Sequence, residues 1–212
     1  MSKMTGIGVI GLTGQSGAGK TTVCKVFEEN GFAIINADLI ARQVVVKGSP
    51  CLKELAECFG ESILTSEKEL DRKKLAKIVF TDDEKRKQLN AIIYPYITYE
   101  ILQRINKYAE ENQHYVLLDA PTLFESGADD FCDLIISVTA TERVRTLRIA
   151  ERDGLTPEQI KERFSSQHTE KYFVNHSDFI IKNNKSLENL IEKAQEVAEK
   201  IKEYFNNAEE AI

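Results

Sequence analysis

The amino-acid sequence predicts an α/β protein of one domain, built on a parallel five-stranded sheet with helices on both faces. Three observations lead to this fold class. A glycine-rich motif follows directly after the first apolar run, short apolar runs then alternate with helical segments, and a long helical stretch separates the second and third runs. We expect the strand order 2-3-1-4-5, with right-handed crossovers. The 212 residues suit one domain with insertions, because single hydrophobic cores stop growing at roughly 250 to 300 residues.

The first strand is expected at residues 7–12 and leads into the glycine-rich motif. The eight positions Gly14-Gln15-Ser16-Gly17-Ala18-Gly19-Lys20-Thr21 fit the pattern G-x-x-x-x-G-K-[ST] of a phosphate-binding loop. The glycines let backbone N–H groups point inward, Lys20 adds a mobile cation for the outer phosphates, and Thr21 supplies a hydroxyl for Mg²⁺. A glycine-rich turn that merely joins a strand to a helix is the alternative, but the agreement of motif and context favours nucleotide binding.

The remaining core elements alternate along the chain. A helix is expected from Thr22 to Asn30, because Gly31 suits the left-handed position just past a helix end. Thr156-Pro157-Glu158-Gln159 forms a capping box that opens a later helix, and Ser186 caps a long C-terminal one. The four other strands are expected at residues 32–36, 115–118, 134–138 and 179–181.

Residues 47–113, between the second and third strands, predict an inserted helical unit. Ser49-Pro50 starts one helix, which Phe59-Gly60 ends. Leu70-Asp71 introduces a second helix that runs through Phe80.

Two further helices are expected in this insert. Thr81-Asp82-Asp83-Glu84 has capping-box spacing and opens the third. This helix is expected to stop near Tyr94, because Pro95 disfavours a helical residue before it. The fourth is expected at residues 97–112.

Composition and charge exclude several classes of protein. Lys and Arg number 28 against 34 Asp and Glu, so the net charge is −6 and the surface as a whole should not attract nucleic acid. No apolar run approaches the roughly 18 residues of a membrane helix. The four cysteines have no metal-ligand spacing, which indicates reduced thiols and a cytoplasmic protein. The oligomeric state stays open.

Asp38 is the candidate general base because of where the chain returns to the motif. The helix after the loop carries the chain roughly 15 Å away, and the second strand brings it roughly 13 Å back. Asp38 is therefore expected at the carboxyl edge of the sheet, beside the phosphate loop. A carboxylate there can orient an acceptor hydroxyl and take its proton during phosphoryl transfer. The alternative is that Asp38 caps the next helix, at residues 39–42, and position alone favours neither.

Two more carboxylates are candidates at the same edge. Asp119 ends the third strand, where an aspartate often approaches Mg²⁺ through water, although it can equally start the turn into Pro121. Glu125 faces either the same cleft or the surface.

Arg145, Arg148 and Arg152 are spaced i, i+3, i+7 and fall on one stripe of a helix. Three guanidinium groups on one face suit a polyphosphate, provided that a lid brings them over the loop. Arg163 and Gln167 are expected to reach the same site. A solvated face, whose ion pairs contribute little, is the alternative.

Taken together, these residues resemble the dephospho-coenzyme A kinase family over nearly the whole chain. Asp38 and the segment from Pro121 to Glu125 separate this family from other small-molecule kinases far better than the phosphate loop does. Besides Gly11 to Thr21, the matching segments are Asn36-Ala37-Asp38-Leu39-Ile40-Ala41-Arg42, Leu70-Asp71-Arg72, Val79-Phe80, Asp119-Ala120-Pro121-Thr122-Leu123-Phe124-Glu125, Arg152-Asp153-Gly154-Leu155, Gln167, Lys171 and Asp178-Phe179-Ile180-Ile181-Lys182-Asn183.

The resemblance implies a three-layer fold of the P-loop kinase type in three parts. These are a nucleotide core (about 1–46, 114–140 and 174–212), a helical substrate-binding insert (about 47–113) and a lid (about 141–173). It also implies ATP-dependent phosphorylation of the 3′-hydroxyl of dephospho-coenzyme A, the last step of coenzyme A synthesis, with Mg²⁺.

The same resemblance implies the residues of the site. Asp38, Lys20 and Arg148 are the expected catalytic groups. ATP is expected to contact residues 14–21, Thr22, Arg148, Arg152 and Asn183, and dephospho-coenzyme A to contact Asp38, Arg42, Tyr94, Leu123, Phe124 and Glu125. Mg²⁺ is expected on Thr21 directly, and on Asp38 and Asp119 through water.

Three positions depart from the family's pattern. Tyr94-Pro95 stands where the family usually has His-Pro, so a substrate contact made by that histidine is lost or passes to the phenol. Arg145 occupies a position often held by glutamine. Asn183-Asn184-Lys185 replaces the usual asparagine with a nearby glycine, which leaves an adenine contact through Asn183 as an expectation.

Two other functions are compatible with the phosphate loop alone. A nucleoside or nucleoside-monophosphate kinase would share the core and take its acceptor contacts from a different insert. A regulatory GTPase would need a guanine-reading Asn-Lys-x-Asp motif, which the sequence lacks.

Overall fold

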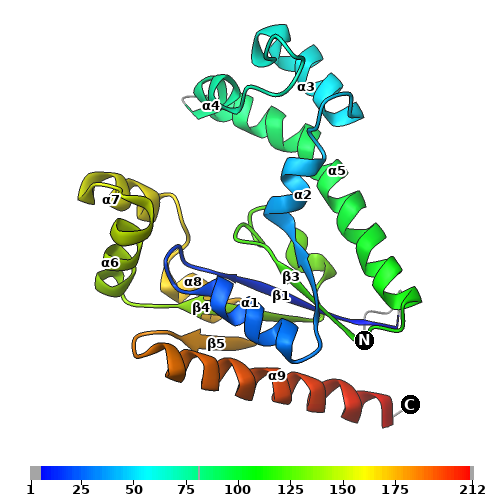
Figure 1. Cartoon of the computed structure of the whole chain (residues 1–212), viewed down its shortest axis with the longest axis vertical. Helices are drawn as coiled ribbons and strands as arrows, with labels where there is room; N and C mark the ends of the chain where they lie inside the picture. Colours follow the sequence, from blue (N-terminus) through cyan, green and yellow to red (C-terminus); the bar gives the residue numbers. More distant parts are fainter. Residues whose placement is uncertain (1–5, 81, 211–212) are drawn as a thin grey trace. The chain divides into compact units, whose positions relative to one another are not determined.

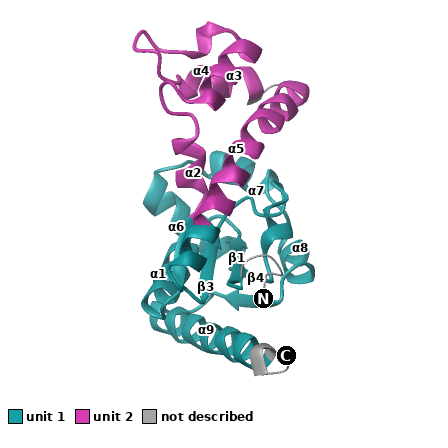
Figure 2. Ribbon diagram, turned by 90° about the vertical axis from the view of Figure 1, so that its right-hand side faces the viewer, with its two compact units in different colours: residues 1–35, 105–212 teal, residues 36–104 magenta. Residues whose placement is uncertain are grey.

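The computed structural model describes residues 6–80 and 82–210, and the chain divides into two compact units. One comprises residues 1–35 and 105–212, and the other comprises residues 36–104 (Figure 2). None of the described helices combines the length and the apolar character that crossing a membrane requires.

The five strands form one sheet in the order β2-β3-β1-β4-β5, as predicted. The central strand, β1 (Gly8–Gly14), is buried along its whole length and pairs in parallel with β3 (Tyr115–Asp119) and β4 (Leu134–Thr139). β5 (Phe179–Lys182) pairs in parallel with β4, and β2 (Ala33–Asn36) lies at the other edge. Each strand differs from its predicted range by at most two residues at either end.

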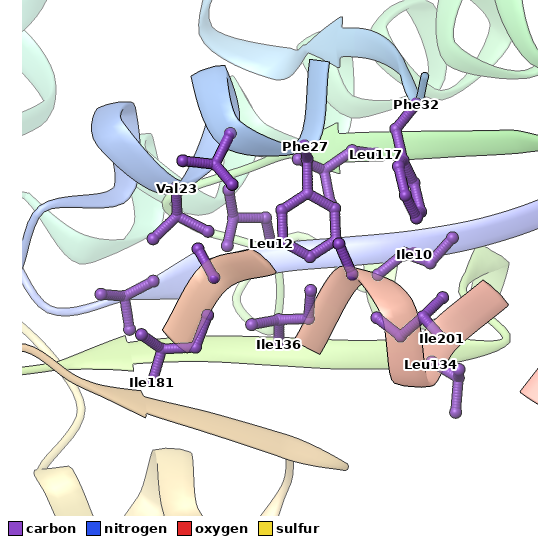
Figure 3. Packing of buried hydrophobic residues seen from close by; sticks show 14 of the residues in the cluster. Ile10, Leu12, Val23, Phe27, Phe32, Leu117, Leu134, Ile136, Ile181 and Ile201 are labelled. Atoms are coloured by element: carbon purple, nitrogen blue, oxygen red, sulfur yellow. The ribbon is translucent and has the colours of Figure 1, made fainter. Parts of the chain in front are cut away.

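The first unit carries its helices around this sheet (Figure 1). α1 (Lys20–Glu29) packs against α9 (Leu187–Glu210). Phe27 of α1 and Ile201 of α9 enter one apolar cluster with Leu12 and Ile136 of the strands (Figure 3). Burying each such side chain contributes roughly 1.5–3 kcal/mol. The other elements of this unit are α6 (Glu142–Asp153), α7 (Pro157–Ser165), α8 (Glu170–Asn175) and the short 3-10 helix Ala128–Phe131.

The predicted helix ends of this unit are confirmed. Gly31 follows α1 with a φ of 85°, a backbone conformation that residues other than glycine rarely adopt. The capping box at Thr156 and Gln159 is formed on both sides. The Ser186 hydroxyl accepts a bond from the Asn189 N–H at 3.4 Å at the start of α9.

The second unit is helical, with α2 (Ala37–Gln43), α3 (Pro50–Phe59), the 3-10 helix Glu61–Ile63 and α4 (Arg72–Phe80). Ser49 caps α3 by accepting a bond from the Leu52 N–H at 3.2 Å, as its sequence predicts. The division into core, insert and lid stays a prediction.

α5 (Asp83–Glu110) corrects the sequence analysis, because it is one helix of 28 residues that contains Pro95. Pro95 disfavours the helical conformation of the residue before it and removes one backbone donor, at a cost of about 3 kcal/mol. The buried side chains of Ile101 and Ile105, beyond the proline, offset this cost by holding the second half in place. Thr81 of the predicted capping box lies outside the described residues, and the Asp82 carboxylate accepts bonds from the N–H groups of Glu84 and Lys85.

Candidate active site

The predicted phosphate loop has the backbone that its motif requires. Gly14 ends β1 and Lys20 opens α1, so residues 15–19 form the connection. Gly17 and Gly19 have φ values of 77° and 105°, which favour glycine. At Gly14 a Cβ atom would stand 2.1 Å from the Val138 carbonyl oxygen, so this position has no room for a side chain.

The N–H groups of the loop divide into two sets. The protein itself binds those of Gln15 (to the Val138 oxygen, 3.2 Å), Ser16 (to Gln167 Oε1, 3.1 Å) and Ala18 (to the Gln15 oxygen, 3.1 Å). The N–H groups of Gly17 and Gly19 have no partner within residues 6–80 and 82–210. Unpaired N–H groups before the first turn of a helix are well suited to bind phosphate oxygens.

Two carbonyl groups of the loop accept hydrogen bonds from side chains of other elements. Arg148 of α6 makes a long contact of 3.5 Å to the Gly17 oxygen, and Asn183 Nδ2 donates to the Ala18 oxygen at 2.8 Å. Arg148 also donates to the Asn183 carbonyl oxygen at 3.3 Å and to Asn183 Oδ1 at 3.2 Å. Arg148 thus lies beside the phosphate loop, and Asn183 joins the two.

The other two arginines of the stripe have different surroundings. Arg145 is 6% exposed, its guanidinium carbon lies 3.9 Å from the centre of the Phe164 ring, and its Nε donates to the Ala140 oxygen. Burial lowers the pKa of Arg145. Arg152 is exposed and bonds to Asp153, which also binds Arg163 at 2.6 Å. These two partners hold the pKa of Asp153 far below its usual range. Within the described chain, the expected cluster is therefore reduced to Arg148, while Gln167 reaches the loop and Arg163 does not.

A pocket of about 310 Å³ lies beside the loop in the first unit. Its lining includes Gln15, Arg145, Phe164, Gln167 and His168. Gln15 is 5% exposed, and its Oε1 has no hydrogen-bond partner among the described residues.

The donor atoms expected for Mg²⁺ are oxygens near the start of α1. Thr21 lies in the first turn and is exposed, and Asp119 ends β3 opposite Leu12 of β1. Burial and, secondly, the Asp119 carboxylate raise the pKa of the Cys24 thiol to about 11, which indicates that Asp119 lies near this helix. The described chain has no group of three or more His, Cys, Asp or Glu side chains that could hold a metal. Such a sparse oxygen set fits Mg²⁺, which takes most of its ligands from phosphates and water.

The side chain of Lys20 folds back over the loop. Its Nζ donates to the Gly14 oxygen at 3.4 Å. The Lys20 ammonium group therefore lies at the phosphate loop.

The segment from Leu123 to Glu125 packs within the first unit. Leu123 is fully buried, and a Cβ on Gly11 would stand 2.8 Å from it, so in this structure Leu123 is a core residue. Phe124 meets the Tyr172 ring edge to face at 5.4 Å, and Glu125 Oε1 lies 3.5 Å from His168 Nε2.

Asp38 lies in the second unit, as the second residue of α2. The N-cap of this helix is Asn36, whose Oδ1 accepts the Leu39 N–H at 2.8 Å, so the alternative that Asp38 caps it is wrong. Asp38 is exposed, and its carboxylate has no hydrogen bond or ion pair with any residue that the structure describes. Arg42 is exposed on the same helix, and Tyr94 is half-buried on α5. The approach of Asp38 to the phosphate loop stays a prediction.

Asn184 and the side-chain role of Asn183 were missed by the sequence analysis. Asn184 Oδ1 accepts the Thr141 N–H at 2.7 Å, next to the start of α6. Neither contact has a local sequence signal, because the partners lie 43 and 165 residues apart.

Comparison with known proteins points to one family. Residues 8–189 match the family model described as dephospho-CoA kinase. The chain is 37% identical over 180 residues to a dephospho-CoA kinase of Oceanobacillus iheyensis, which covers 85% of this chain and 90% of that protein. It is 39% identical over 179 residues to one of Listeria monocytogenes, covering 84% and 90%.

Two solved structures resemble this chain over most of its length. The dephospho-CoA kinase of Campylobacter jejuni has a TM-score of 0.69 and 30% identity, covering 91% of this chain and 96% of that one. The structure of TT1252 from Thermus thermophilus has a TM-score of 0.79 and 28% identity, covering 90% and 95%.

Proposed function

The chain belongs to the dephospho-CoA kinase family, and its activity is the ATP-dependent phosphorylation of dephospho-coenzyme A in coenzyme A biosynthesis; we propose that the phosphate goes to the ribose 3′-hydroxyl with Asp38 as the general base. The observation that carries this role is the capping of α2 by Asn36. Since Asn36 serves the helix, the exposed Asp38 carboxylate keeps its acceptor capacity for an incoming hydroxyl.

Lys20 and Arg148 stabilise the phosphates of ATP. In phosphoryl transfer the protein supplies mainly positioning and charge stabilisation, because the transition state is loose and places negative charge on the phosphoryl oxygens. The contacts of Lys20 to the Gly14 oxygen and of Arg148 to the Gly17 oxygen support this assignment, because both cations are already at the loop. Gly17 and Gly19 contribute N–H groups to the same phosphates.

Thr21 would bind Mg²⁺ directly, and Asp38 and Asp119 would do so through water. When bound, the ion neutralises charge on the phosphates. The exposed Thr21 hydroxyl and the proximity of Asp119 to α1 support this arrangement.

Arg42, Tyr94, Phe124 and Glu125 are the remaining proposed contacts of dephospho-coenzyme A. The exposed Arg42 guanidinium suits its phosphates, and the Tyr94 phenol takes the place of the family's usual histidine. Arg152, which is exposed, is proposed to turn from Asp153 to ATP.

Asp38→Asn tests the general base. The amide keeps the size of the side chain but cannot take the proton, so single-turnover transfer with both substrates bound should slow by about 10²- to 10⁴-fold. ATP affinity should hardly change.

Asp83→Asn is the matched control for this test, because Asp83 is also an exposed aspartate in the first turn of a helix of the second unit. Its ion pair with Arg86 is on the surface and contributes little. A near-normal transfer rate of Asp38→Asn would rule Asp38 out as the base.

A further inference from the structure

Asn183 is a buried residue whose side-chain nitrogen and oxygen each make a hydrogen bond to the protein itself. The residue is 5% exposed and directly follows β5. Its Nδ2 donates to the Ala18 oxygen at 2.8 Å, and its Oδ1 accepts from Arg148 at 3.2 Å. Its backbone N–H donates to the Thr139 oxygen at 2.8 Å, and its backbone carbonyl accepts from Arg148 at 3.3 Å. The side chain is therefore fastened on both sides, to the loop and to α6.

The bond from Asn183 determines which way one peptide group of the phosphate loop faces. In a trans peptide the C=O and the following N–H point in opposite directions, and the described chain contains no cis peptide bond. Because the Ala18 carbonyl is held toward Asn183, the Gly19 N–H is aimed to the other side of the loop. This N–H has no protein partner in the described part of the chain.

Asn183 also gives a second reason for the glycine at position 19. A Cβ atom there would stand 2.5 Å from Asn183 Nδ2, which is closer than real contacts allow. The amide of Asn183 thus occupies the space that a side chain at position 19 would need.

We propose that Asn183 is a positioning residue of the phosphate loop: it turns the Ala18–Gly19 peptide so that the Gly19 N–H meets a nucleotide phosphate, and it holds Arg148 beside the loop. This inference rests on the proposed function, in which Gly19 and Arg148 meet the phosphates of ATP. It replaces the adenine contact expected for the side chain, because the amide is buried and both of its ends are bonded to protein.

Asn183→Leu is the sharpest test, since the side chain keeps nearly the same size, adds no charge beside the phosphates, and loses the donor to Ala18 and the acceptor that faces Arg148. Binding is measured by titration calorimetry with Mg-ATP and, separately, with Mg-tripolyphosphate, which carries no adenine. The loss of these two buried hydrogen bonds should weaken the binding of both ligands by the same factor, about tenfold. Asn183→Ala is the second variant, and it should also weaken both ligands.

Asn184→Ala is the matched control. Asn184 is the neighbouring asparagine, and its Oδ1 accepts the Thr141 N–H, with no hydrogen bond to the phosphate loop among the described residues. Its substitution should leave tripolyphosphate affinity unchanged.

Weaker ATP binding with unchanged tripolyphosphate binding would mark Asn183 as an adenine contact and overturn the proposal. So would unchanged affinity for both ligands in variants that merely unfold at a lower temperature, since that pattern belongs to a structural role alone. The readout is equilibrium binding without turnover, so its failure leaves the Asp38 base unaffected, and failure of the Asp38 test leaves this proposal unaffected.

Discussion

Arg145 and Arg148 lie one turn apart on α6 and have opposite surroundings. Arg145 is buried under Phe164 and serves the packing of α6 on α7. Arg148 reaches across to the loop and to Asn183. The spacing i, i+3 correctly places both on one side of the helix, but it does not distinguish a packing arginine from a phosphate-binding one.

Arg148→Ala should therefore reduce chemistry rather than acceptor binding. Removing one preorganised donor from a phosphoryl-transfer site costs about 10²- to 10³-fold in rate. The measurement is single-turnover transfer, together with the Kd for dephospho-coenzyme A. Arg143→Ala is the matched control, because Arg143 is exposed on the same helix. A larger loss in dephospho-coenzyme A affinity than in rate would place Arg148 in the acceptor site.

Asn36 and Asp38 show how little separates a structural residue from a candidate catalytic one. Both stand at the start of the same short helix, α2, and both are of residue types that cap helices well. Asn36 takes the cap because its backbone is extended, with φ −98° and ψ 110°, whereas Asp38 already belongs to the helix.

At the scale of elements, α5 shows a long helix continuing through a proline. The sequence predicts two helices separated at Pro95, whereas the structure has one from Asp83 to Glu110. The prediction of a helix end at Pro95 considers only the local cost of proline inside a helix. The burial of Ile101 and Ile105 on the same helix depends on distant parts of the chain.

Pro95→Ala should stabilise the protein. The substitution restores a backbone N–H inside a helix and removes the steric clash of the ring, so the free energy of unfolding should rise by up to about 3 kcal/mol. Urea unfolding followed by circular dichroism measures it. Pro157→Ala is the matched control, because Pro157 occupies the first turn of α7, where a backbone N–H has no helical partner. Equal effects of the two substitutions would contradict the explanation.

At the scale of the whole molecule, the two units carry different parts of the proposed chemistry. The phosphate loop, Asp119, Arg148 and Asn183 belong to the first unit, and Asp38, Arg42 and Tyr94 belong to the second. We therefore propose that ATP and Mg²⁺ bind chiefly to the first unit. The proposed general base and most proposed contacts to dephospho-coenzyme A belong to the second.

Mg-ATP should stabilise the first unit, and removal of the metal should reverse this. A ligand at 100 times its Kd raises the free energy of unfolding by about 2.7 kcal/mol. Hydrogen exchange should show the protection in the loop and α1, with little change in α3 and α4. Adding EDTA to the ATP complex should remove most of the effect. Identical protection with and without EDTA would show that the metal has no part in nucleotide binding.

The sequence by itself determined the strand, loop and helix of the phosphate site and most helix caps. These features depend on residues that are near neighbours in the chain, so glycine positions, capping residues and apolar runs suffice to predict them. Only the tertiary structure decided that Leu123 and Arg145 are buried, that Asn183 spans from the loop to Arg148, and that α5 continues through Pro95. The reason is physical: the Arg148 and Asn183 contacts to the loop join residues 131 and 165 positions apart, and the side chains that fill such contacts are selected by packing between elements rather than by local backbone preference.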